Sequence, residues 1–386
     1  TNPPTNPPTN PPTPPPSNPP TNPPSSPPPT PSTPPTPAQQ DDFPAAIKAR
    51  AGQFDFVVDA KLVETATHTT IQVKNGRPHN ITMEFKVDPV SGEMVMFAYM
   101  AGDMMSPDVD VYRVTPQGEL VESFRINTPY PAMVHDFVVT ENYIVIPVFP
   151  LTANLERAMQ GQPPIAWEAD KGASVAILPR QGWSQENLRW AECDPFFVFH
   201  YMNGYDSNGV ITLDGCQFEH PPLFTDAAGN QLPDSDPILH RWSIDLNVAS
   251  PRVASRQIDE YGSEFPQVDP RYATREYRYG FYTSPDGDDG DLYNILGRFD
   301  HHDGSVDRYC FGPRETHFTS EAIFVPKSDD AAEGCGYLLS VVTDMTVGTS
   351  ALHILDAENV SDGPLAVAQL NHRVPVGFHG GWRPGS

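Results

Sequence analysis

Three of the twelve histidines lie at the edges of strongly apolar segments, where an imidazole is unusual. His135 follows Pro-Ala-Met-Val, His200 follows Phe-Phe-Val-Phe, and His379 follows Val-Gly-Phe. A lone imidazole in such surroundings costs free energy unless it is hydrogen-bonded or bound to a metal. Neutral imidazoles suit Fe(II), which leaves open positions for dioxygen and substrate. Taken singly, each histidine fits a hydrogen-bonded core residue better than a metal ligand, and spacing cannot link residues so far apart.

The other histidines have polar or turn-like neighbours. The run His301-His302-Asp303 has the composition of a metal cluster, but it precedes a glycine among turn residues, which favours a structural or surface role. Ordinary hydrogen-bonding roles are also expected for His220, His240, His353 and His372.

Short runs rich in β-branched and aromatic residues, separated by turn signals, follow from about residue 52. Such runs lie at 54–63, 93–100, 110–115, 143–149, 174–179, 196–202, 209–214, 321–326, 337–344 and 351–357. The best short helix candidate is 153–160. Many short strands in one long domain predict a sandwich, a barrel or a propeller, and a propeller suits the length best. No repeat of about 40 residues is visible.

The composition and the charge of the chain indicate its domain organisation and limit its partners. Residues 1–42 are rich in Pro, Thr and Asn and predict an extended, disordered linker, which leaves room for an upstream domain. Residues 43–386 predict one large domain. The net charge of −25 argues against binding to nucleic acid, which needs clustered Lys and Arg. No apolar run reaches the length of about 18 residues that a membrane span requires.

The four cysteines are widely spaced and have neither CxxC nor zinc-site spacing. They are Cys193, Cys216, Cys310 and Cys335. We expect buried free thiols, and a disulfide pair stays open as the alternative for a secreted protein.

The sequence motifs around the three histidines link them to one family. The segment 133–145 reads M-x-HDF-x-x-TENY-x-V, 199–205 reads F-H-x-x-N-x-Y, and 374–380 reads VPVGFHG. These resemble the second, third and fourth iron-ligand motifs of the carotenoid cleavage oxygenases, in particular of the lignostilbene dioxygenase and apocarotenoid oxygenase type. The segments 263–271 and 320–326 resemble those that carry the family's outer-shell glutamates, which places Glu264 and Glu321 in that role. Such carboxylates orient ligand imidazoles and raise their basicity.

The family's first iron histidine is replaced. It belongs to a motif T-A-H-P-K-x-D-P-x-T-G-E, which aligns with residues 82–93 and puts Glu84 at the histidine position. A carboxylate can bind Fe(II), so three histidines and Glu84 form a reasonable ligand set. His79 could substitute only through a strand slip, and its odd offset directs it to the opposite sheet face.

The resemblance implies an all-β fold, a seven-bladed β-propeller. This propeller is expected to be incomplete at the N-terminus, because the family's R-N-G-P-N and W-F-D-G-D-G-M segments do not occur here. The lysine and tyrosine with which lignostilbene-type enzymes contact the phenol ring belong to that region and cannot be carried over. Exposed strand edges would then need a partner chain, a further domain or residues 43–80 to cover them.

The resemblance also implies an Fe(II) dioxygenase that cleaves an alkene C=C bond of a stilbene-like or apocarotenoid substrate into two carbonyl products. The partners would be the apolar alkene and O2, with Phe196–Tyr205 and Tyr277–Tyr282 as candidate tunnel walls. The compartment stays open: the resemblance implies a soluble cytoplasmic protein, and secretion is compatible with the sequence. One alternative is a catalytically silent domain with a binding or structural role. Another is an unrelated propeller hydrolase with carboxylate-bound Ca²⁺.

Overall fold

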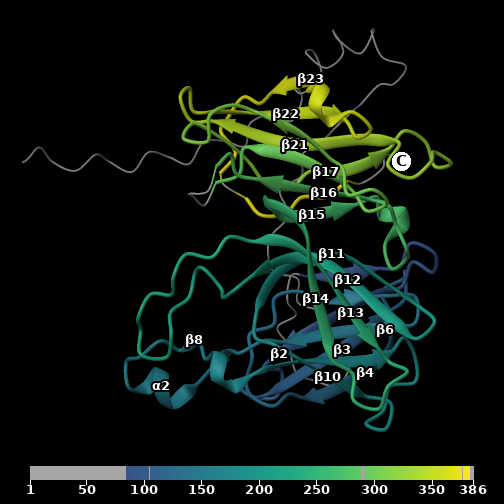
Figure 1. The fold of residues 1–386 in the computed structure, drawn as a ribbon, viewed down its shortest axis with the longest axis vertical. Coiled ribbons are helices and arrows are strands. Elements are labelled where there is room, and N and C mark those ends of the chain that lie inside the picture. Colours follow the sequence, from purple (N-terminus) through teal and green to yellow (C-terminus); the bar gives the residue numbers. More distant parts are fainter. Residues whose placement is uncertain (1–83, 104, 288–291, 376, 383–386) are drawn as a thin grey trace, which may run out of the picture. The chain divides into compact units, whose positions relative to one another are not determined.

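The computed structural model describes residues 84–103, 105–287, 292–375 and 377–382. The linker predicted at 1–42, the strand predicted at 54–63 and the alternative ligand His79 lie outside these residues. The described part belongs to one compact unit, 44–386. Its regular secondary structure is almost entirely antiparallel β-strand, and the strands run along the chain from blue to yellow in Figure 1.

The strands form five successive sheets of the kind found in propeller blades. The first sheet has the order β1-β2-β3-β4 and consists of β1 (Phe85–Val87), β2 (Met94–Tyr99), β3 (Asp108–Val114) and β4 (Leu120–Asn127). The second has the order β10-β9-β6-β5 and consists of β5 (Val138–Val139), β6 (Tyr143–Val148), β9 (Ala173–Pro179) and β10 (Arg189–Cys193). The third has the order β11-β12-β13-β14 and consists of β11 (Phe197–Ser207), β12 (Val210–Phe218), β13 (Ile238–Asp245) and β14 (Val253–Gly262).

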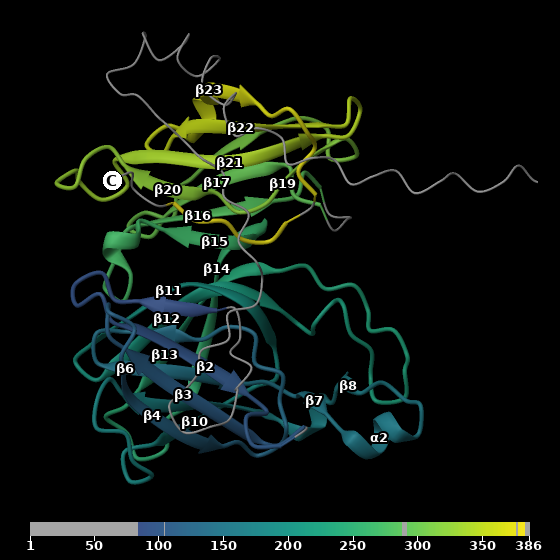
Figure 2. The same cartoon turned by 180° about the vertical axis from the view of Figure 1, so that it is seen from behind.

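The last two sheets lie beside one another in both ribbon views (Figures 1 and 2). The fourth has the order β15-β16-β17-β18 and consists of β15 (Glu264–Val268), β16 (Tyr279–Ser284), β17 (Ile295–Asp300) and β18 (Val306–Cys310). The fifth has the order β19-β21-β22-β23, with β20 also paired to β21, and consists of β19 (His317–Thr319), β20 (Ile323–Pro326), β21 (Gly336–Asp344), β22 (Thr349–Asp356) and β23 (Pro364–Gln369). Within the described residues the sheets do not close into a ring.

Shorter elements complete the described chain. The strands β7 (Leu151–Ala153) and β8 (Ile165–Trp167) form a separate pair, joined by the helix α2 (Leu155–Met159). This helix confirms the prediction at 153–160, and the side chain of Asn154 caps its N-terminus by accepting from the N–H of Arg157 at 2.9 Å. Three 3₁₀ helices are η1 (Ala169–Lys171), η2 (Pro270–Tyr272) and η3 (Val360–Asp362).

Central strands of the second and the fourth sheet are buried on both faces, because each of these sheets packs between two others. In β6, Ile144 and Ile146 join a core cluster with residues of β2 and β3, whereas Val145 between them joins a cluster with residues of β11–β13. In β16, Phe281 and Tyr282 are divided in the same way between the fifth and the third sheet. Successive side chains of a strand point to opposite faces, so the continuous apolar runs of the sequence serve two interfaces at once.

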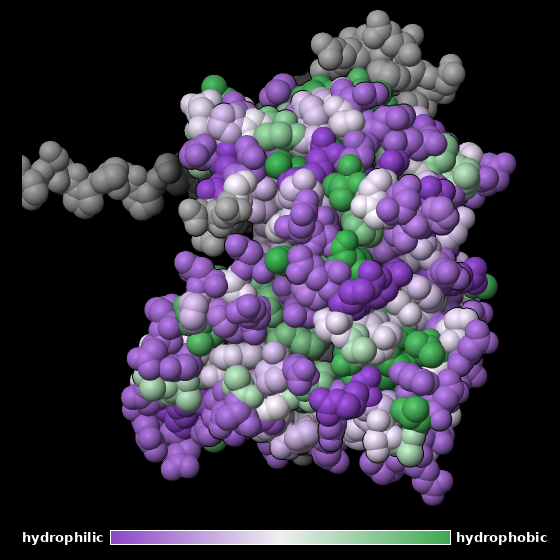
Figure 3. Space-filling model, in the orientation of Figure 1, coloured by the Kyte–Doolittle hydropathy of each residue, from purple (hydrophilic) through white to green (hydrophobic). Residues whose placement is uncertain are grey.

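The surface and the cysteines agree with the sequence in part. Hydrophilic residues predominate on the face shown in Figure 3, with hydrophobic residues in small separate areas. All four cysteines lie in the described residues and are free thiols. Cys193 and Cys216 are buried as predicted, but Cys310 is exposed and Cys335 partly exposed, because both lie close to turns at strand ends. No helix among the described residues is long and apolar enough to cross a membrane.

Candidate metal centre

The residues predicted from the motifs come from the edge strands on one side of successive sheets. The strand β11 lies against both β5 and β15, and β15 lies against β20. The six predicted residues are Glu84 before β1, His135 before β5, His200 in β11, Glu264 at the start of β15, Glu321 before β20, and His379 in the C-terminal segment. A radial arrangement of sheets therefore brings together residues that are far apart in the sequence.

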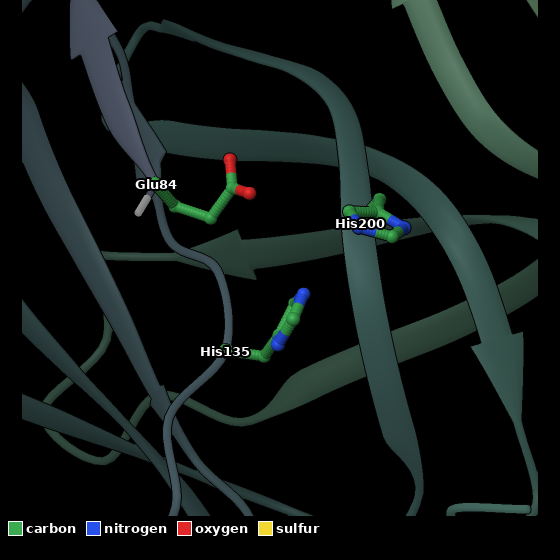
Figure 4. Close-up of side chains that lie close together, drawn as sticks. All are labelled: Glu84, His135 and His200. Carbon is green, nitrogen blue, oxygen red and sulfur yellow. The ribbon is translucent and has the colours of Figure 1, made fainter. Parts of the chain in front are cut away.

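Three of these side chains converge on one point. Glu84, His135 and His200 each offer a ligand atom, and these atoms all lie within 4.8 Å of one another. Figure 4 shows the three side chains directed toward a common space. The ring centroids of His135 and His200 are 5.1 Å apart, with the planes at 79°.

His379 joins this group from the C-terminal segment. Its Nε2 is 3.4 Å from Oε1 of Glu84, and its ring centroid is 4.7 Å from that of His200. It lies beside the group within 4.8 Å rather than inside it. We refer to Glu84, His135, His200 and His379 together as the histidine centre.

Two carboxylates hold imidazoles of the histidine centre from behind. Oε2 of Glu264 is 2.5 Å from Nδ1 of His200, and Oε2 of Glu321 is 3.1 Å from Nδ1 of His379. Glu321 also accepts from the N–H of Gly380, which anchors the segment that carries His379. When each Nδ1–H donates a hydrogen bond to a carboxylate, the Nε2 lone pair of the same ring faces the centre.

Burial and charge set the protonation of the centre. Burial, reinforced by the proximity of His200, lowers the pKa of His135 to about 4, so that its imidazole is neutral at pH 7. Burial also lowers the pKa of His200, but the charge and hydrogen bond of Glu264 more than offset it, and the pKa is raised. The pKa of Glu84 is raised by burial and then by Asp136, while Lys86 and the histidines oppose the shift.

Sequence reasoning assigned no role to Lys86 and Asp136, although both lie next to the centre. Nζ of Lys86 is 2.7 Å from Oδ1 of Asp136, whose side chain is 1% exposed. The sequence does place both residues beside predicted ligands, because Lys86 stands two residues after Glu84 and Asp136 directly follows His135. Their convergence depends on the approach of β1 to the segment before β5, which the sequence alone does not give.

Aromatic rings surround the histidines. Phe199 lies edge-on to His135 at 5.1 Å between centroids, and Phe265 lies 5.2 Å from His200. Phe265 has a φ of 48°, in the left-handed region that a bulky residue rarely adopts, and its ring also contacts Phe378 and Tyr293. Phe199 belongs to the predicted tunnel wall at 196–205.

The other predicted wall, Tyr277–Tyr282, is wrong. Tyr277 and Tyr282 are buried between the third and the fourth sheet, and their hydroxyls donate to Asp214 and Asp259, each at 2.6 Å. Phe281 is buried against the fifth sheet. The aromatic density of the segment serves packing. The structural role predicted for His301 is confirmed, because its ring is buried against Tyr277 and its Nδ1 is 2.9 Å from Nη2 of Arg241.

The donor set fits a transition-metal ion. Imidazole nitrogens and one carboxylate suit Fe(II). Nε2 of His200 is buried and has no hydrogen-bond partner in the described structure, although its ring is held firmly through Nδ1. A buried polar atom without a partner is unfavourable, and a metal ion at the point of convergence would satisfy it.

Successive antiparallel sheets that direct histidines and a carboxylate to one point define a class of β-propellers with a candidate metal centre. Within this class, the chain belongs to the carotenoid oxygenase family: the family model described as "Retinal pigment epithelial membrane protein" matches residues 53–384. This confirms the predicted resemblance and contradicts the alternative of an unrelated Ca²⁺-dependent hydrolase.

Similar proteins include named oxygenases. The chain is 33% identical over 318 residues to isoeugenol monooxygenase of Pseudomonas putida, covering 79% of this chain and 66% of the relative. It is 30% identical over 347 residues to lignostilbene-α,β-dioxygenase isozyme III of Sphingomonas paucimobilis, covering 86% of this chain and 70% of the relative. The chain thus spans only about two thirds of these relatives' lengths.

Solved structures agree with the fold. The lignostilbene dioxygenase of Pseudomonas brassicacearum superposes with a TM-score of 0.75 at 30% identity, covering 79% of this chain and 66% of that one. Cobalt-substituted Synechocystis ACO superposes with a TM-score of 0.71 at 25% identity, covering 80% and 66%. The prediction of a carotenoid-oxygenase propeller is confirmed.

Proposed function

We propose that this chain is a non-haem Fe(II) dioxygenase that cleaves an alkene C=C bond of a stilbene-like or apocarotenoid substrate into two carbonyl products. The observation that carries the proposal is the convergence of Glu84, His135 and His200, with His379 beside them, on one point. A second observation supports the proposal: Nε2 of His200 is buried, has no hydrogen-bond partner among the described residues and faces this point.

In this proposal His135, His200, His379 and Glu84 hold the iron, which supplies the activation of O2 when bound. Glu264 and Glu321 accept hydrogen bonds from Nδ1–H of His200 and His379, which fixes the tautomer and the angle of each ring. The low pKa of His135, caused first by burial, keeps its ring neutral and available as a ligand.

The surroundings of the centre support an apolar substrate. Phe199, Phe265 and Phe378 lie on or near the histidines, and Phe378 is 62% exposed. Aromatic surfaces of this kind hold flat unsaturated molecules and exclude water from the reacting bond. The names of two relatives refer to isoeugenol and lignostilbene, which favours an aryl alkene.

One observation favours a second candidate, a catalytically silent domain with a binding or structural role. The carboxylate of Glu84 lies 3.4 Å from Nε2 of His379 and adds negative charge where the family motif has a neutral histidine. An anionic ligand changes both the redox potential and the open coordination positions of the iron.

The test is a product assay. The purified chain is loaded with Fe(II) under argon and given O2 with resveratrol, isoeugenol or an apocarotenal, and the products are separated by liquid chromatography. The wild-type chain should convert at least one of these substrates into the aldehyde that cleavage of its C=C bond yields. His135→Ala, the control, should form no aldehyde. Folded, iron-loaded protein that forms no aldehyde from any of them contradicts the dioxygenase and favours the silent domain.

A further inference from the structure

The carboxylate of Asp136 lies behind the histidine centre and makes three bonds that the proposed chemistry does not use. Its Oδ1 is 2.7 Å from Nζ of Lys86 and accepts from the N–H of Phe137 at 2.7 Å. Its Oδ2 accepts from the N–H of Tyr201 at 2.8 Å. The side chain of Asp136 is 1% exposed and that of Lys86 is 28% exposed, so the carboxylate end of these bonds is shielded from water.

These three partners belong to the three segments that carry the converging ligands. Lys86 stands two residues after Glu84, at the start of β1. Phe137 belongs to the segment of His135, and Tyr201 directly follows His200 in β11. One buried carboxylate therefore ties together the backbones on which Glu84, His135 and His200 are mounted.

This arrangement differs from that of Glu264 and Glu321. Those two carboxylates each bond the imidazole of one ligand and so control the orientation of one ring. Asp136 bonds backbone amides and a lysine, so its bonds control the distances between segments. A metal site needs both kinds of control, because ligand positions must hold to within about 0.5 Å.

We propose that Asp136, together with Lys86, is a positioning pair that sets the spacing of Glu84, His135 and His200 for metal binding. The inference rests on the proposed metal centre and adds residues that act on it without touching the ion. The Lys86 side chain also lies over the ring of Phe137, 6.0 Å from its centroid, which restricts its ammonium group to the side of Asp136.

The variant Asp136→Asn removes this function with little change in volume. An amide has one accepting and one donating end, whereas Asp136 accepts at both oxygens. If the amide oxygen faces Lys86 and the N–H of Phe137, the amide nitrogen faces the N–H of Tyr201. In the other orientation the nitrogen faces Lys86. Either way a buried donor faces a donor, and the segments of β1 and β11 lose their common anchor.

The experiment titrates the full chain with Co(II) and records both affinity and the visible d–d absorption, which reports coordination geometry. We expect Asp136→Asn to weaken Co(II) binding by about 10- to 100-fold, the range seen when outer-shell partners of metal ligands are removed, and to change the d–d spectrum. The matched control is Asp214→Asn, whose side chain is 0% exposed and paired with Arg241 away from the centre. It should lower thermal stability but leave affinity and spectrum unchanged.

A milder variant guards against misfolding. Lys86→Met keeps both backbone amide bonds of Asp136 and should cause a smaller loss of affinity with the same direction of spectral change. The double variant Lys86→Met/Asp136→Asn should lose no more than Asp136→Asn alone, because the two residues act as a unit. If both single variants bind Co(II) with the wild-type affinity and spectrum, the positioning inference is wrong and the pair is structural. If the wild-type chain binds no Co(II), the metal centre and the inference both fall.

Discussion

Two buried clusters of this protein contain the same kinds of side chain but differ in what those side chains leave free. One is the histidine centre. The other, which we call the arginine network, consists of Asp214, Arg241, Tyr277 and His301 and lies between the third and the fourth sheet. Each combines carboxylate and imidazole groups on neighbouring sheets, so residue type alone does not separate them.

In the arginine network the carboxylate is fully used. Both oxygens of Asp214 accept from Arg241, at 2.7 and 2.8 Å, and Tyr277 donates at 2.6 Å. His301 bonds Arg241 through Nδ1. Among the described residues its buried Nε2 has no hydrogen-bond partner and belongs to no group of three converging ligand atoms. In the histidine centre, by contrast, three ligand atoms lie within 4.8 Å of one another. Convergence of free ligand atoms, rather than burial of polar groups, marks the functional cluster.

The largest expected effect belongs to the arginine network. Asp214→Ala leaves Arg241 buried without its counter-ion, which costs about 3–5 kcal/mol of unfolding free energy. Urea denaturation followed by fluorescence measures this loss. Asp303→Ala is the control, because this exposed turn carboxylate accepts from the amide of Ser305 beside the same network, and its loss should change stability by less than about 0.5 kcal/mol. Equal effects of the two substitutions contradict a closed structural network.

Next in size is the loss of a ligand. His200→Ala removes the nitrogen at the point of convergence and should weaken iron binding by about 100-fold or more, equivalent to about 2.7 kcal/mol. Equilibrium dialysis against Fe(II) under argon gives the affinity. His240→Ala serves as the control, since that ring lies in β13 and bonds the carbonyl of Ile238. Unchanged iron affinity in His200→Ala would contradict the histidine centre as the iron-binding site.

A smaller effect is expected from the carboxylates behind the rings. Glu264→Gln keeps the shape but weakens the bond to Nδ1 of His200, so iron affinity should fall by about 10-fold while the fold remains intact. Glu321→Gln should act in the same direction through His379. Thermal melts of the apo proteins exclude a general loss of stability as the cause. If neither variant alters iron binding, these bonds serve packing alone, as in the arginine network.

The smallest change concerns the departure from the family pattern. Glu84→His restores the motif and should raise Fe(II) affinity or alkene cleavage several-fold if Glu84 occupies the first-ligand position. Glu84→Gln, which removes the charge but not the volume, should lower both. An unaltered affinity and rate in both variants means that Glu84 only faces the ion.

Much of the fold could be predicted from hydrophobic runs. The continuous apolar runs of β6 and β9 predict strands buried on two faces. The strands β4 and β14 could not be found in this way, because they lie at sheet edges and alternate charged residues with few apolar ones. Their strand structure is imposed by pairing with β3 and β13.

The ligands of the candidate site could be predicted from the sequence, but the residues that position those ligands could not. His135, His200 and His379 stand out as imidazoles in apolar runs, and the family motifs join them to Glu84. The bonds of Asp136 to Lys86 and Tyr201 depend on which segments become neighbours in space, over separations of 50 and 65 residues. Sequence periodicity carries no information on contacts of that range.

The most direct test of the histidine centre is the metal content of the purified chain after reconstitution with an equimolar mixture of Fe(II) and Ca²⁺ under argon. Mass spectrometry of the digested protein should find about one iron per chain and no calcium, and His135→Ala/His200→Ala should contain neither metal. A wild-type chain without iron, or a double variant that retains it, contradicts the account.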